Sequence, residues 1–138
     1  MKPGSNVVIT KGAPNLITSQ QLKRDSEKLL EKIALDGRPK IGLLIGGSNE
    51  NFLISDALID KVISEVMALS SDLEADILAT TSRRTPEALE KKIADKLSNF
   101  KNCKFLVLVN KQNFDFALGG ILGLSDIVVV SGDSSSMV

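Results

Sequence analysis

The sequence contains no histidine, no tryptophan and no tyrosine, and its only cysteine is Cys103. Without histidine, the chain cannot build a Ser-His-Asp or Cys-His active site, and most kinds of zinc site are excluded. A single cysteine forms no internal disulfide bond, which favours a reducing compartment such as the cytoplasm. Aromatic residues make up only 4% of the chain, which argues against a surface that stacks the bases of a nucleic acid.

The motifs of common nucleotide cofactors are also absent. No G-x-G-x-x-G sequence follows a candidate strand, and no G-x-x-x-x-G-K-[ST] sequence occurs, so NAD-type and Walker-type sites are not expected. Only carboxylates remain as metal ligands, and neither Asp126 nor Asp133 has a second carboxylate at a suitable spacing. We therefore expect no metal and no cofactor.

Neither net charge nor long apolar segments point to a charged or lipid partner. The chain has 17 basic and 17 acidic residues, so no overall field favours nucleic acid or an anionic membrane surface. Its apolar runs are shorter than the roughly 20 residues that span a bilayer, and residues 1–10 lack the hydrophobic region of a signal peptide. We expect a cytoplasmic protein without a membrane span.

Short β-branched apolar runs alternate with amphipathic stretches of helical spacing. Such runs are typical of buried parallel strands, and strands that alternate with helices form βαβ units. We therefore predict one α/β domain over residues 1–138, with a Rossmann-like three-layer arrangement and a mostly parallel sheet. The predicted strands are residues 7–9, 41–45, 76–80, 105–109 and 127–130.

Two helices are expected in the first half of the chain. Thr18 and Gln21 form a capping pattern before the first helix, and the Gly- and Pro-containing segment 36–39 marks its end. The second helix is expected to begin at Ser55, an N-cap candidate, and to reach about Leu69.

Two further helices are expected in the second half. The third has the clearest start, with Thr85 as its N-cap and Pro86 at its first helical position. The fourth covers about residues 114–124, where three glycines are expected to weaken it.

The carboxyl ends of parallel strands share one edge of the sheet, and open α/β sheets bind their ligands there. The paired glycines at residues 46–47 let the backbone approach a phosphate closely. Residues 80–86 place two guanidinium groups ahead of a helix N-terminus, which also attracts anions. We predict that a phosphate-bearing ligand contacts Gly46, Gly47, Ser48, Ser82, Arg83, Arg84, Thr85, Ser134, Ser135 and Ser136.

Two more polar turns fall at this edge. The lysine and amides of residues 110–113 offer contacts to sugar hydroxyls or to a base. Residues 131–136 combine a glycine with several hydroxyls, which suits a phosphate or a sugar. Taken singly, each turn is equally explained as an ordinary polar loop, so the hypothesis depends on the turns coming together.

Several segments together resemble the mitochondrial-fission-factor family, whose bacterial members carry the label of predicted nucleoside-diphosphate-sugar epimerases. The most specific strings are TTSRRTP at residues 80–86 and SGDSSSMV at residues 131–138, joined by residues 6–10, 12–13 and 45–48. The resemblance covers nearly the whole chain. The epimerase label is at odds with the missing dinucleotide fingerprint, so we favour the glycosyltransferase-like reading of the family.

By this resemblance the chain looks like the C-terminal, donor-binding half of a GT-B glycosyltransferase. The resemblance implies that the glycine turn and Ser48 meet the diphosphate of a nucleotide-diphosphate sugar and that Arg83 and Arg84 neutralise it. It also implies that the serine cluster lies near the phosphate or sugar. Enzymes of this fold bind no metal for the leaving diphosphate, so positive side chains and helix ends take that role.

The resemblance further implies a domain excised from a longer two-domain protein, with the missing N-terminal domain as its partner. In the family, the pattern after Val138 continues to an acidic residue for the ribose. We expect the isolated domain to bind its ligand weakly and to be inactive. The alternative is a non-catalytic interaction module related to an organelle-fission factor. The sequence names no catalytic residue, base, sugar or acceptor.

Overall fold

The computed structural model describes residues 17–48 and 53–131, and helices alternate with strands throughout this part of the chain. The α/β class predicted from the sequence is confirmed. The strand predicted at residues 7–9 lies outside the described residues. The elements are α1 (Ser19–Leu30), β1 (Lys40–Leu44), α2 (Asp56–Asp72), β2 (Asp76–Thr80), α3 (Glu87–Leu97), β3 (Cys103–Val107), α4 (Ala117–Leu124) and β4 (Ile127–Val130).

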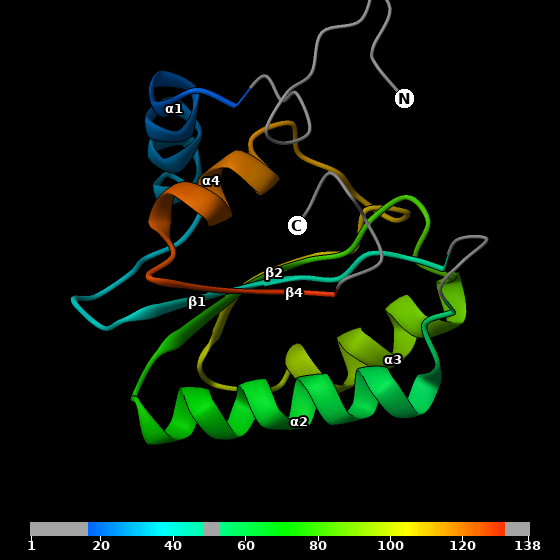
Figure 1. Ribbon diagram of the computed structural model, residues 1–138. Coiled ribbons are helices and arrows are strands. Elements are labelled where there is room, and N and C mark those ends of the chain that lie inside the picture. The colour runs from blue at the N-terminus through cyan, green and yellow to red at the C-terminus, as the bar shows by residue number, and fades with distance from the viewer. Residues whose placement is uncertain (1–16, 49–52, 132–138) are drawn as a thin grey trace, which may run out of the picture.

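The four described strands form one parallel sheet in the order β3-β2-β1-β4 (Figure 1). In β1, Leu43 pairs with Ala79 of β2 on one side and with Val129 of β4 on the other. The two central strands are the most buried, because each has a strand on both sides and helices on both faces. Their near-continuous apolar sequence is what a doubly covered parallel sheet requires.

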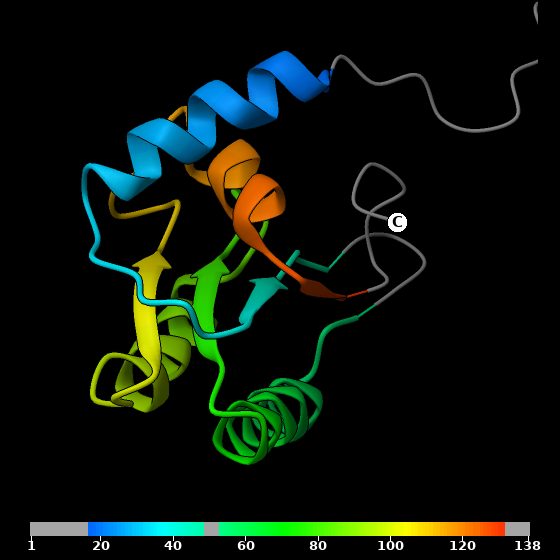
Figure 2. The same ribbon diagram turned by 90° about the vertical axis from the view of Figure 1, so that its left-hand side faces the viewer.

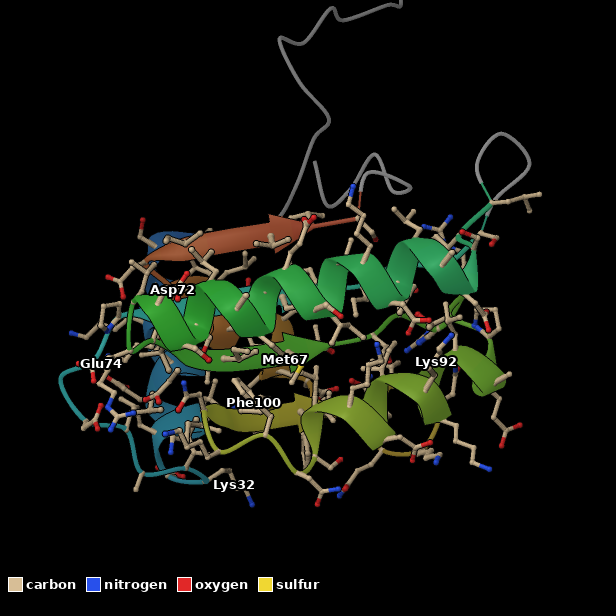
Figure 3. All side chains as sticks on the ribbon, turned by 90° about the horizontal axis from the view of Figure 1, so that it is seen from below. Lys32, Met67, Asp72, Glu74, Lys92 and Phe100 are labelled. Atoms are coloured by element: carbon tan, nitrogen blue, oxygen red, sulfur yellow. The ribbon has the colours of Figure 1, made fainter. Side chains whose placement is uncertain are left out.

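Two layers of helices cover the sheet (Figure 2). Helices α1 and α4 lie on one face, and α2 and α3 lie on the other. Figure 3, seen from below, shows α2 and α3 side by side in front of the sheet, where Met67 and Phe100 pack against the larger apolar core. The sheet therefore has a separate core on each face, one around Ile41 and Ile63, the other around Leu29 and Leu78.

The three glycines of α4 form its contact with α1. A Cβ on Gly119 or Gly123 would overlap side-chain oxygens of Asp25 or Ser26 in α1. A Cβ on Gly120 would lie 2.9 Å from the backbone oxygen of Asp25. The glycines were expected only to weaken this helix, but they let two helices pack backbone to backbone.

Several predicted boundaries shift for identifiable reasons. The strand predicted at residues 105–109 is Cys103–Val107, because the amide of Val109 bonds to the Thr81 side chain instead of a strand. Helix α1 ends at Leu30, well before the stop signal at residues 36–39. Its N-cap is Thr18, as predicted, and Ser55 likewise caps α2.

Candidate functional site

The carboxyl edge of the sheet brings the predicted glycine and arginine segments together. Figure 1 shows the loops after β1, β2 and β3 on the side where the strands end. The amide of Gly46 donates to the hydroxyl oxygen of Ser131 at 2.8 Å, which joins the end of β1 to the end of β4. The amide of Ile45 donates to the carbonyl oxygen of Thr80 at 2.9 Å, which joins the end of β1 to the end of β2.

Thr85 fastens the β2–α3 loop to the glycine turn. Its side-chain hydroxyl donates to the carbonyl oxygen of Gly46 at 2.7 Å and accepts from the amide of Ser82 at 3.0 Å. The residue is 2% exposed. The prediction that Thr85 caps α3 is wrong, because its hydroxyl is committed to these loops and Pro86 occupies the N-cap position without a side-chain bond.

Gly47 lies against the backbone of Arg84. A Cβ at Gly47 would overlap the carbonyl group of Arg84, so only glycine allows the two loops to approach this closely. Close approach of the backbone was expected at this turn, but towards a phosphate. The observed neighbour is the arginine loop itself.

The side chains of Arg83 and Arg84 are exposed at the tip of this loop. Among the described residues neither guanidinium group has an ion-pair partner. The loop is nevertheless held in shape, because the amide of Arg84 donates to Ser82 Oγ at 3.2 Å. Two positive charges are thus presented beside the glycine turn by a fixed backbone.

The remaining predicted residues divide into two groups. The hydroxyl of Ser48 accepts from the amide of Ile54 at 3.0 Å, so it supports the segment that leads into α2. Ser134, Ser135 and Ser136 lie outside the described residues. The role of all ten predicted residues in ligand binding remains a prediction.

A buried glutamate under this edge was missed by the sequence reasoning. Glu90 is 0% exposed, and its Oε1 accepts from the hydroxyl of Thr81 at 2.6 Å and from the amide of Asn110 at 3.2 Å. Its Oε2 has no hydrogen-bond partner among the residues that the structure describes. The available signal was spacing, since Glu90 shares a helix face with the buried Ile93 and Leu97.

Asn110 continues this network to the arginine loop. Its side-chain amide donates to the carbonyl oxygen of Thr85 at 2.8 Å. The sequence had suggested that amides of this loop contact a ligand. In the structure, the Asn110 amide instead ties the β3–α4 loop to the β2–α3 loop.

A cavity of about 300 Å³ opens beside this network. Thr81 and Ser82 line it from the β2–α3 loop, while Asn113, Phe114 and Asp115 line it from the segment before α4. Cavities of this size are at the lower end of the range for small-molecule sites. The carboxyl edge therefore combines a basic loop, a glycine turn and an adjoining hollow.

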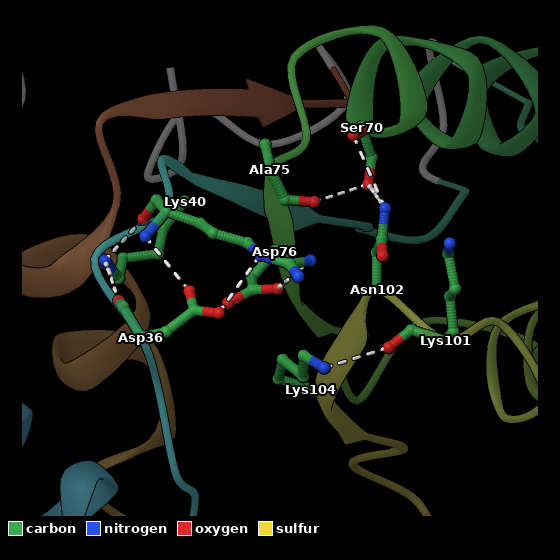
Figure 4. Close-up of polar contacts among 9 residues, drawn as sticks. Asp36, Lys40, Ser70, Ala75, Asp76, Lys101, Asn102 and Lys104 are labelled. Carbon is green, nitrogen blue, oxygen red and sulfur yellow. Dashed lines mark hydrogen bonds and ion pairs between the residues drawn. The ribbon is translucent and has the colours of Figure 1, made fainter.

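A second polar cluster lies at the opposite, amino edge of the sheet (Figure 4). Asp76 is 1% exposed, and neither of its carboxylate oxygens accepts a hydrogen bond from residues 17–48 or 53–131. The guanidinium group of Arg38 lies 3.0 Å from Asp36 and 4.0 Å from Asp76. Within the described ranges, no three acidic or cysteine side chains gather as a metal site. This cluster has the features of a structural ion pair.

Cys103 has the properties of a structural thiol. Burial raises its pKa to about 11, so the reactive thiolate is scarce at neutral pH. It therefore does not supply a nucleophile. Among the helices of residues 17–48 and 53–131, none combines the length and apolar character that crossing a bilayer requires.

Comparison with known proteins gives one finding. No curated protein and no solved structure matches the chain. A comparison with known protein families matches residues 1–138, the full length, to the family described as Mitochondrial fission ELM1. This agrees with the resemblance carried by the arginine and serine segments. The chain belongs to the mitochondrial fission ELM1 family.

Proposed function

We propose that the carboxyl edge of this domain binds the diphosphate of a nucleotide-sugar, as the donor-binding part of a GT-B-like glycosyltransferase. One observation carries the proposal. Gly47 packs against the backbone of Arg84, and the adjacent Arg83 and Arg84 side chains are exposed without ion-pair partners in the described chain. Two predicted ligand segments that are far apart in sequence therefore form one positively charged surface where α/β sheets bind ligands.

Guanidinium groups carry most of the anion binding in this arrangement. The amide of Gly46 already donates to Ser131. Pro86 has no amide hydrogen, and Glu87 and Glu90 lie in the first turn of α3, so that helix end attracts anions weakly. Arginine, by contrast, offers a planar pair of donors that matches two phosphate oxygens.

The proposal is tested by isothermal titration of the chain with UDP and GDP. Each charge-assisted hydrogen bond to a phosphate contributes roughly 1.5–3 kcal/mol, less where water competes. Changing Arg83 and Arg84 to Ala should therefore weaken binding about tenfold or more. Arg24→Ala is the matched control, since Arg24 is also exposed but lies on α1, and it should bind like the wild type. Equal binding by all three proteins would refute the proposal.

A non-catalytic interaction module is the second candidate, favoured by the β4 edge of the sheet, which pairs on its outer side with no other described strand. Ile127 and Val128 are each 40% exposed. An apolar cavity of about 320 Å³ lies between α2, β1 and the end of β4. The family description, mitochondrial fission, also concerns organelle division and not sugar transfer. Absence of nucleotide binding, together with capture of a protein partner by the longer protein, would favour this candidate.

A further inference from the structure

The cavity beside the arginine loop is lined by polar, aromatic and acidic side chains and, among the described residues, by no basic one. Asn113, Phe114 and Asp115 form one side of it, and Thr81 and Ser82 form the other. Ser82 directly precedes the two arginines in the sequence. A ligand whose phosphates lie over the arginines therefore has the cavity within immediate reach.

The charge around the cavity is negative. Asp115 lines it, is exposed, and has no ion-pair partner among the described residues. Helix α4 begins just behind it at Ala117, and its positive end already faces Asp25 of α1, which is 4% exposed and abuts Gly119. A phosphate in the cavity would meet Asp115 without a compensating cation. The cavity therefore disfavours an anionic group.

The polar groups of the cavity favour a hydrogen-bond donor. An ionised carboxylate only accepts hydrogen bonds and has two oxygens to do so, while the side-chain amide of Asn113 both donates and accepts. Phe114 provides an aromatic surface, and its ring is held by Phe116 with a centroid separation of 5.3 Å. A flat ring with two adjacent donors fits this set.

Among the common bases, guanine alone has this pattern. Its ring N–H and exocyclic amino group lie side by side and match the two oxygens of a carboxylate. Uracil has a single N–H that lies between two carbonyl oxygens. A carboxylate that accepts from this N–H is repelled by the neighbouring oxygens. Adenine and cytosine each place an acceptor beside their amino group. We propose that the cavity is a base subsite and that Asp115 selects guanine; this inference rests on the proposed function.

The experiment compares the affinities of GDP, UDP, ADP and CDP for the chain by isothermal titration. We expect GDP to bind about tenfold or more tightly than the other three, the range of one or two charge-assisted bonds. Asp115→Asn should remove this preference by bringing GDP down to the affinity of UDP, while leaving UDP binding unchanged or slightly stronger. Asp95→Asn is the control, because it makes the same change on α3, on the other face of the sheet.

The outcomes separate the two proposals. Equal affinity for the four nucleotides, lost when Arg83 and Arg84 are changed to Ala, would overturn guanine selection and leave the diphosphate site standing. A guanine preference that depends on Asp115 but not on the arginines would support the base subsite and refute the diphosphate site. Absence of binding by all four nucleotides would overturn both.

Discussion

At the scale of single residues, the hydroxyl of Thr85 has the most consequences for the site. It is buried and connects the glycine turn to the arginine loop through its bonds to Gly46 and Ser82. Thr85→Val keeps the shape and removes the hydroxyl, which leaves the buried carbonyl of Gly46 and the half-buried amide of Ser82 without this partner. We expect the free energy of unfolding in urea to fall by about 1–3 kcal/mol.

Thr85→Ser serves as the control, because it restores the hydroxyl and loses only a methyl group, worth about 0.8 kcal/mol. Valine should therefore cost more than serine, and it should also weaken nucleotide binding. If serine proved as destabilising as valine, the methyl group and not the hydrogen bonds would explain the effect.

The sequence predicted where the site residues lie better than it predicted which residues they contact. The sequence located Thr85 and Gly47 at the ligand edge, and both lie there. It did not reveal that Thr85 bonds to Gly46 or that Gly47 packs against Arg84, because contacts between residues some 40 positions apart depend on the register of two strands. Glu90 was missed because a glutamate on a helix is usually exposed, although its spacing from Ile93 and Leu97 indicates the buried face.

At the scale of elements, the packing of α1 on α4 depends on the absence of side chains from α4. Gly120→Ala would place a Cβ 2.9 Å from both the backbone oxygen of Asp25 and the Cβ of Leu29. Overpacking of this kind costs about 1–3 kcal/mol, against a gain of about 0.5–1 kcal/mol in helix propensity. We expect a net loss of stability of about 1–2 kcal/mol in urea unfolding.

Gly37→Ala is the comparison for this experiment, since no atom lies within 4 Å of the added Cβ. It should change the stability by less than about 0.5 kcal/mol. A stabilising Gly120→Ala substitution would show that α1 and α4 are less closely packed than described.

An ion cluster joins the other two helices. Lys92 of α3, labelled in Figure 3, lies 2.6 Å from the Asp60 carboxylate of α2, and Lys96 lies 2.9 Å from it. Hydrogen bonds from Lys92 and then Lys96 lower the pKa of Asp60 below its usual 3.8. A carboxyl group with a lowered folded-state pKa stabilises the fold above the unfolded pKa, and this contribution disappears as the pH falls through the folded value.

Asp60→Asn should therefore lower the urea midpoint at pH 7, and the difference from the wild type should shrink below pH 3.8. Asp95→Asn makes the same substitution on α3, outside this ion cluster, and is the matched control. A difference for Asp60→Asn that is constant from pH 7 to pH 2 would contradict the electrostatic explanation.

Element types were predictable and their ends were not. The alternation of apolar runs and amphipathic stretches predicted every strand and helix of the described residues. Ends shifted where a side chain competed for a backbone group, as where Thr81 takes the amide of Val109. The role of the glycines of α4 was not predictable from the sequence, because they allow the close packing of α4 on α1, a helix distant in the chain.

At the scale of the whole molecule, the parallel sheet places the glycine turn and the arginine loop at one edge. This arrangement follows from the βαβ pattern, because all parallel strands end on the same side. The order of strands and the choice of which loops touch did not follow from the sequence. The family match agrees with the family resemblance that these segments suggested. That they bind a nucleotide-sugar is our proposal.

The most direct test is an NMR titration of the ¹⁵N-labelled chain with GDP up to millimolar concentration. We predict that the largest amide shifts fall on residues 46–48 and 82–85, with smaller shifts around residues 113–115. Arg83→Ala combined with Arg84→Ala should strongly reduce these shifts at the same GDP concentration. Unmoved resonances at residues 46–48 and 82–85, or shifts confined to the amino edge around Asp76, would contradict the account.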